Sequence, residues 1–127
     1  MSDLNFEPEK FKVFVRYLIQ VAKEKRCVPY NELENIFGLS HGQVGIYAGK
    51  LGDYCLNRKI AKLNGLIINV TDCVPSYGYD WYEKQYGKRW GEIVSDCWRE
   101  FHVTSSRKKQ VQDFSKRDVD VQAFLDE

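Results

Sequence analysis

The stretch of this 127-residue sequence that most restricts its fold is Pro29–Cys55, which has the pattern of two short helices around a tight turn. Apolar side chains in its first half recur at spacings of three and four, so they share one helical face: Tyr30, Leu33 and Phe37. Gly38 suits the left-handed position that ends a helix. Ser40 and Gln43 have the spacing of a capping box at the start of the next helix. This order predicts a helix-turn-helix.

Amphipathic patterns predict further helices on both sides of this unit. Residues 8–25 carry a wide apolar stripe, and Pro8 suits the first helical position because it has no N–H to leave unsatisfied. Residues 88–102 repeat the helical pattern around tryptophan, cysteine and phenylalanine. We therefore expect a domain over residues 1–105, followed over residues 106–127 by a basic linker and a C-terminal amphipathic arm packed on the same domain.

Between these helices the sequence predicts a small β-hairpin. Asn64 and Gly65 form the strongest two-residue hairpin signal, because both residues tolerate positive φ. The apolar, β-branched residues 66–70 predict a buried strand, and the alternating aromatics of residues 77–81 predict a second one. Two strands after a helix-turn-helix would form a wing. The predicted fold is mainly α with a small β wing (α+β): a winged helix-turn-helix with extra C-terminal helices.

Four segments in order carry a family resemblance over about residues 10–80: VPYNELE, GKLG, LNGLIIN and PSYGY. They resemble the winged-helix domain of the alkyltransferase-like superfamily, which implies a DNA-binding winged helix. Repair enzymes of that family place a reactive cysteine in a Pro-Cys-His-Arg motif just before the buried strand. The matching stretch here contains Asn64 and no thiol, and the position of the family's base-replacing arginine falls at about Gly45. The resemblance therefore implies DNA binding without alkyl transfer.

Composition and motifs exclude several classes of function. The 43% hydrophobic and 14% aromatic content excludes a disordered chain, and the net charge of +1 requires that any nucleic acid bind a local patch. No apolar run is long enough to span a membrane, and the N-terminus lacks a signal peptide. The four cysteines form no CxxC pair and are interpreted as reduced core residues of a cytoplasmic protein. With no phosphate loop, no metal-ligand spacing and no histidine paired with a cysteine, we expect no catalytic site, metal or cofactor, and hence no enzyme.

The candidate binding residues lie on the second central helix and beyond it. With the apolar side of that helix inward, three glycines share the opposite face, and each costs about 1 kcal/mol relative to alanine. Such a face lets another backbone approach closely. Basic residues follow the helix, and tyrosines of the predicted wing suit stacking beside cations. The predicted DNA- or partner-binding residues are Gly42, Gln43, Gly45, Ile46, Gly49, Lys50, Arg58, Lys59, Lys62, Tyr77 and Tyr79.

Two functions remain open from the sequence. The first is a non-enzymatic DNA-binding module that contacts the phosphate backbone, because only Gln43 and Lys50 on this face suit base edges. The second is a protein-interaction module, an adaptor or inhibitor that binds a protein partner or itself through the glycine-rich face and the aromatic and basic wing region. A third possibility is that the glycine face packs against the C-terminal segment of the same chain.

Overall fold

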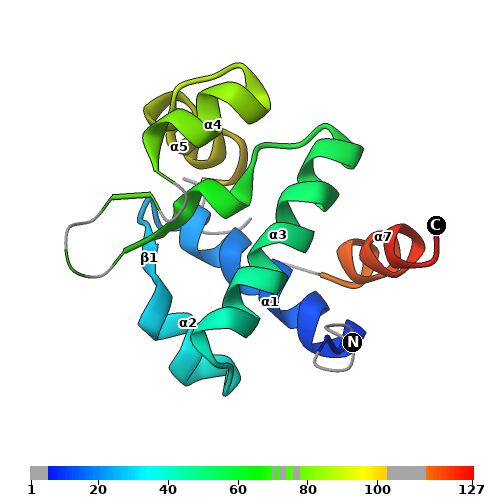
Figure 1. The fold of residues 1–127 in the computed structure, drawn as a ribbon. Helices are drawn as coiled ribbons and strands as arrows, with labels where there is room; N and C mark the ends of the chain where they lie inside the picture. Colours follow the sequence, from blue (N-terminus) through cyan, green and yellow to red (C-terminus); the bar gives the residue numbers. More distant parts are fainter. Residues whose placement is uncertain (1–5, 70, 72–73, 76–77, 103–113) are drawn as a thin grey trace.

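The computed structural model describes residues 6–69, 71, 74–75, 78–102 and 114–127. Within these residues the chain is mainly helical, with one two-stranded parallel sheet. α1 runs through the middle of the molecule, with α2 at one end and α4 and α5 at the other, while α7 lies beside α1 and α3 (Figure 1). The elements are α1 (Pro8–Lys23), β1 (Val28–Pro29), α2 (Tyr30–Phe37), α3 (His41–Arg58), the 3-10 helix η2 (Leu63–Leu66), β2 (Ile67–Ile68), α4 (Tyr79–Tyr86), α5 (Trp90–Phe101) and α7 (Ser115–Leu125).

The core is built around α1. Its apolar stripe is fully buried at the positions that the pattern indicates, including Phe11, Phe14 and Leu18. Pro8 begins the helix as predicted. Phe6, just outside the helix, packs on Phe11 with ring centroids 5.3 Å apart, which fixes the angle at which the chain enters.

The predicted helix pair is present as α2 and α3. Gly38 ends α2 in the left-handed conformation, at φ 64°. The capping box of α3 is also present: the Gln43 backbone N–H donates to Ser40 Oγ at 3.2 Å, and the Ser40 N–H donates to Gln43 Oε1 at 2.8 Å. A second network joins the start of α2 to α1, because Glu32 accepts hydrogen bonds from both Tyr17 and Arg26.

The prediction of a β-hairpin turn at Asn64 and Gly65 is wrong. Asn64 and Gly65 lie inside η2 instead, where both are buried and neither has a positive φ. The strand predicted over residues 66–70 is shorter, because β2 pairs in parallel with β1 only over Val28–Pro29 and Ile67–Ile68. Ile68 also forms an isolated antiparallel bridge with Pro75.

The strand predicted over residues 77–81 is also wrong. Tyr79 begins α4, which ends at Gly87 in the left-handed conformation, and Tyr77 lies outside the described residues. Tyr82 explains the difference: it is fully buried and donates through its hydroxyl to the Asn64 carbonyl oxygen at 3.3 Å. The segment therefore forms a helix that buries one side against η2, instead of a strand whose side chains alternate between two faces.

The C-terminal amphipathic segment forms α7, which packs on α1 and α3 (Figure 1). Val121 is its one fully buried side chain. Polar contacts also attach α7 to α3, because Tyr54 on α3 donates to Asp120 Oδ2 at 2.5 Å. The basic linker predicted before this arm falls largely in residues 103–113, outside the described part of the chain.

No helix among the described residues combines the length and the apolar character that crossing a membrane requires.

Candidate functional site

The two sides of α3 differ sharply in what surrounds them. One side is packed into the core through fully buried Val44, Tyr47 and Leu51. On the other side, Cβ atoms placed on Gly42 and Gly49 would meet nothing within 4 Å. The outer face predicted from the sequence is therefore open at these two positions.

Two further residues of this face have closer surroundings. A Cβ atom on Gly45 would lie 3.4 Å from the Tyr30 hydroxyl, so α2 partly fills the space there. Ile46 keeps 39% of its surface exposed despite its apolar side chain. Gln43, by contrast, uses its side-chain oxygen to cap α3 and does not present that acceptor to a ligand.

The basic residues predicted for the same face are held by α7. Lys50 Nζ lies 5.3 Å from the centre of the Phe124 ring, a cation–π contact. Arg58 pairs with Asp120 Oδ1 at 3.0 Å and with Glu127 Oε2 at 2.8 Å. Thus the C-terminal segment covers the basic side chains of α3 while the glycines stay open.

Tyr54 anchors this contact from the α3 side. Burial, together with the hydrogen bond to Asp120, raises the pKa of the Tyr54 hydroxyl to about 12. The phenol therefore remains a proton donor at neutral pH. Arg117 on α7 donates to the same hydroxyl at 3.2 Å, so α7 and α3 share a connected polar network.

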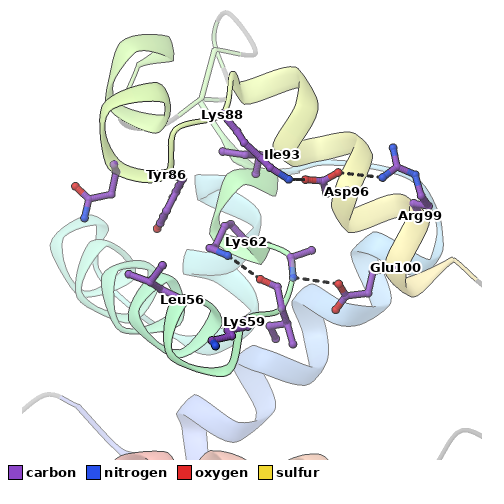
Figure 2. A pocket seen from close by; sticks show the side chains of 12 residues that line it. Leu56, Lys59, Lys62, Tyr86, Lys88, Ile93, Asp96, Arg99 and Glu100 are labelled. Carbon is purple, nitrogen blue, oxygen red and sulfur yellow. Dashed lines mark hydrogen bonds and ion pairs between the residues drawn. The ribbon is translucent and has the colours of Figure 1, made fainter.

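A cleft of about 580 Å³ lies near several of the predicted residues, between the end of α3 and the helices α4 and α5 (Figure 2). Lys59 and Lys62 line it from the segment that follows α3. Lys88 and Arg99 line it from the opposite side, around α5. The cleft thus joins two residues that the sequence predicted with two that it did not.

Charges on the α5 side of the cleft are paired with each other. Asp96 accepts from Lys88 Nζ at 2.6 Å and from Arg99 Nη1 at 3.1 Å (Figure 2). The hydrogen bond from Lys88 lowers the pKa of the Asp96 carboxyl and the same contact raises the pKa of Lys88, so both groups are charged at neutral pH. The second carboxylate of the cleft, Glu100, accepts the Ala61 backbone N–H at 3.2 Å.

The lysines on the facing side have no carboxylate partner in the part of the chain that the structure describes. Lys62 Nζ donates to the Ile60 carbonyl oxygen at 2.9 Å and lies 5.6 Å from the centre of the Tyr86 ring. Lys59 follows the last turn of α3 in the left-handed conformation, at φ 57°, and is exposed. Within the described residues neither lysine makes an ion pair.

A buried polar cluster lies behind the cleft and involves a glycine that the sequence pattern does not indicate. A Cβ atom on Gly52 would lie 2.8 Å from the Tyr86 hydroxyl and 3.0 Å from Asn64 Nδ2. Those two groups are hydrogen-bonded at 3.2 Å, while Asn64 Oδ1 is buried without a hydrogen-bond partner among the described residues. No periodicity in α3 points to Gly52, because its neighbours come from η2 and α4.

The predicted site residue Tyr79 does not line the cleft. Tyr79 lies in the first turn of α4, 55% exposed, and contacts the Trp90 ring edge-on at 5.8 Å. Tyr86, at the end of the same helix, is the tyrosine that reaches the cleft. The helical spacing of α4, rather than strand alternation, decides which tyrosine does so.

The two buried thiols are enclosed by the core, and both histidines contact other groups of the protein. Burial raises the pKa of the Cys55 thiol to about 12 and also raises that of Cys97, so both are protonated at neutral pH. His41 Nδ1 lies 3.1 Å from Glu34 Oε2, and His102 Nδ1 lies 2.8 Å from the Lys23 carbonyl oxygen. Among the residues described, no group of three or more metal-ligating side chains comes together.

Comparison with known proteins does not extend this description: no protein-family model, no curated protein and no solved structure matches the chain.

Proposed function

We propose that this protein is a non-enzymatic DNA-binding module that lays the open face of α3 against a sugar-phosphate backbone. The observation that carries the proposal is the pair Gly42 and Gly49, which face open space on a helix whose other side is core. Glycine is costly inside a helix, by about 1 kcal/mol relative to alanine. Since nothing within the described chain fills the space beside these glycines, an external backbone is the simplest reason for them.

The order of elements supports the same proposal. We infer a winged-helix arrangement, in which α3 is the recognition helix and the antiparallel bridge between Ile68 and Pro75 forms the base of the wing. In helix-turn-helix proteins the second helix of the pair lies in a groove of the duplex. The hydrogen bond from the Asn69 backbone N–H to the Val74 carbonyl oxygen, at 2.8 Å, turns the chain back at the corresponding place.

Backbone contact fits this face better than base readout. Reading base edges needs bidentate donors and acceptors such as Arg, Asn and Gln. Here the Gln43 side-chain oxygen caps its own helix, and Arg58 is paired with Asp120 of α7 and with Glu127 just beyond it. A sequence-independent mode that depends on close approach is therefore the form of DNA binding that we propose.

One observation favours a second candidate, a protein-interaction module. Ile46 is 39% exposed between the open glycines, and the basic side chains nearby are covered by α7. An apolar, weakly charged face of this kind also suits a partner helix or a second copy of the chain. Salt distinguishes the two candidates, because binding to phosphates releases counterions and weakens steeply with salt.

The test is a fluorescence-anisotropy titration of a short labelled duplex at low and at physiological salt, beside a light-scattering mass. We expect duplex binding to weaken by orders of magnitude with salt if several phosphates are contacted. Gly42→Leu and Gly49→Leu should each abolish binding without lowering the melting temperature, because leucine favours helix. Gly91→Leu is the matched control: Gly91 is also open and, like Gly42, is the second residue of its helix.

Each outcome has a defined meaning. Duplex binding that the leucine variants of α3 lose and the Gly91 variant keeps supports the DNA proposal. A dimer that salt barely affects, and that the same α3 variants disrupt, supports the interaction module instead. Unchanged DNA binding and unchanged mass in both α3 variants would show that this face binds nothing.

A further inference from the structure

The cleft at the end of α3 is distinct from the glycine face and raises a separate question. Its volume of about 580 Å³ lies within the range of roughly 300–1,000 Å³ that small-molecule sites occupy. It is formed by segments far apart in the chain, since residues 56–62 face residues 85–100 across it (Figure 2). The shape therefore suits a compact ligand rather than the continuous groove of a duplex.

The charges of the cleft favour an anion. Four basic side chains line it against two carboxylates, and both carboxylates are engaged with protein donors. Lys59 and Lys62 face the cleft without an ion-pair partner in the described chain. Arg99 is held by a single contact to Asp96 and keeps further guanidinium donors for a ligand. Positive charge thus exceeds negative charge among the side chains that line the cleft.

The apolar wall favours an anion that carries an organic part. Leu56, which is 51% exposed, and Ile60, which is half-buried, form this wall, while Ile93 also lines the cleft but is already buried. Inorganic phosphate would leave this wall in water. The negative pole of α3 also points toward the cleft and weakens the attraction of the lysines for a bare anion. A ligand that buries the wall as well gains the additional free energy of apolar contact.

We propose that the cleft binds a nucleoside monophosphate, with the phosphate between Lys59 and Lys62 and the nucleoside against the apolar wall. Lysine ammonium groups bind phosphate as point charges, while the planar guanidinium of Arg99 offers a second, directional contact. The same chemistry has two sources: a free mononucleotide, or the 5′-phosphorylated end of a DNA strand. This inference goes beyond the proposed duplex binding and does not depend on it.

The test is an NMR chemical-shift titration of the full chain with adenosine 5′-monophosphate. We expect shifts at the residues that line the cleft, and affinity at least about tenfold higher than for adenosine or inorganic phosphate, since each of these lacks one part of the contact. A 5′-phosphorylated oligothymidylate and its unphosphorylated form test the second source. Binding by the mononucleotide identifies a free ligand, and binding by the phosphorylated strand alone identifies a DNA end.

Variants separate this site from the glycine face. Lys59→Asn keeps a residue that tolerates the left-handed conformation, and both it and Arg99→Gln should weaken binding of the mononucleotide at least about tenfold. Lys84→Gln is the control, because Lys84 is exposed on α4 and does not line the cleft. Gly49→Leu should leave mononucleotide binding unchanged even where it abolishes duplex binding. A thermal melt on each variant checks folding.

Two results would overturn the inference. The first is absence of saturable shifts with both the mononucleotide and the phosphorylated strand. The second is binding that Lys59→Asn and Arg99→Gln leave unchanged. Inorganic phosphate that binds as tightly as the mononucleotide would exclude the nucleoside part. Failure of duplex binding alone would contradict the proposed function and leave this site standing.

Discussion

Gly49 and Gly52 lie one turn apart on α3, yet their surroundings are opposite. A Cβ atom on Gly52 would come within 2.8 Å of the Tyr86 hydroxyl, whereas one on Gly49 would meet nothing within 4 Å. Packing inside the chain explains the first glycine, because only a residue without a side chain fits there. It does not explain the second. The same residue type thus marks a structural requirement at one turn of the helix and a candidate binding face at the turn before it.

The largest effect should come from the packed side of α3. Leu51 is fully buried there, so Leu51→Ala should lower the free energy of unfolding by about 2–5 kcal/mol through lost burial and a cavity. Chemical denaturation measures this change. A loss below about 1 kcal/mol would mean that this side of α3 does not face the core, which would contradict the contrast between packed and open positions on the helix.

A smaller loss should follow from filling the space at Gly52. Gly52→Ala places a methyl group 3.0 Å from Asn64 Nδ2 and closer still to the Tyr86 hydroxyl, so these buried groups must shift. Overpacking of this kind costs about 1–3 kcal/mol, and the helix propensity of alanine offsets about 1 kcal/mol of it, so we expect a net loss of up to about 2 kcal/mol. The urea midpoint should fall accordingly. A variant as stable as the wild type would show that the cluster behind the cleft is loose.

The contact between α7 and α3 should respond to Asp120→Asn. The substitution removes the charge that accepts from Tyr54 and pairs with Arg58, and the expected loss is about 1 kcal/mol. Hydrogen exchange in α7 should accelerate, and duplex affinity should rise if Arg58 becomes available to phosphate. Asp126→Asn, near the end of the same helix, is the control and should change neither quantity. Equal effects of both variants would contradict a specific role for Asp120.

The open side predicts a gain in stability rather than a loss. Gly49→Ala should raise the free energy of unfolding by up to about 1 kcal/mol, because alanine favours helix and its methyl group meets no neighbour. Calorimetry should show that the free energy of unfolding rises in Gly49→Ala and falls in Gly52→Ala, although both substitutions lie on one helix. If both variants lose stability, the two glycines do not differ in the way that their surroundings indicate.

The smallest expected effect is a loss of stability at low pH. The hydrogen bond from Arg26 lowers the pKa of the Glu32 carboxyl, which joins α2 to α1. A pKa lowered by folding stabilises the protein above the unfolded value of about 4.3, and this stabilisation is lost as pH falls toward the folded value. Melting temperature should therefore decline in that range. The decline should be shallower in Glu32→Gln, and identical pH profiles would assign the acid sensitivity to other carboxylates.

Local signals in the sequence were sufficient for the helix pair and for α1. The capping box of Ser40 and Gln43, the left-handed Gly38 and Pro8 at the start of α1 all appear as predicted. Each of these depends on side chains within a few residues of one another. Such contacts form as soon as the helix forms, so their pattern can be recognised without the rest of the chain.

The hairpin prediction failed where distant contacts outweighed a local preference. Asn64 and Gly65 suit a tight turn in isolation. In the fold, a Cβ atom on Gly65 would lie 2.6 Å from Ile93 Cγ2, and the Trp90 indole donates to the Gly65 carbonyl oxygen at 2.7 Å. These contacts, and the burial of Asn64, favour a 3-10 turn pressed against α5.

The sequence by itself determined α1, α2, α3 and α5, the buried side of α3 and the glycines on its outer side, because periodicity records which face of an element is apolar. Only the tertiary structure decided what each polar residue of the candidate site meets. It places Arg58 against Asp120 of α7 and brings Lys62 and Arg99 to the two sides of one cleft. The physical reason is distance along the chain: these partners are separated by whole helices, and no local spacing encodes which of them will become neighbours.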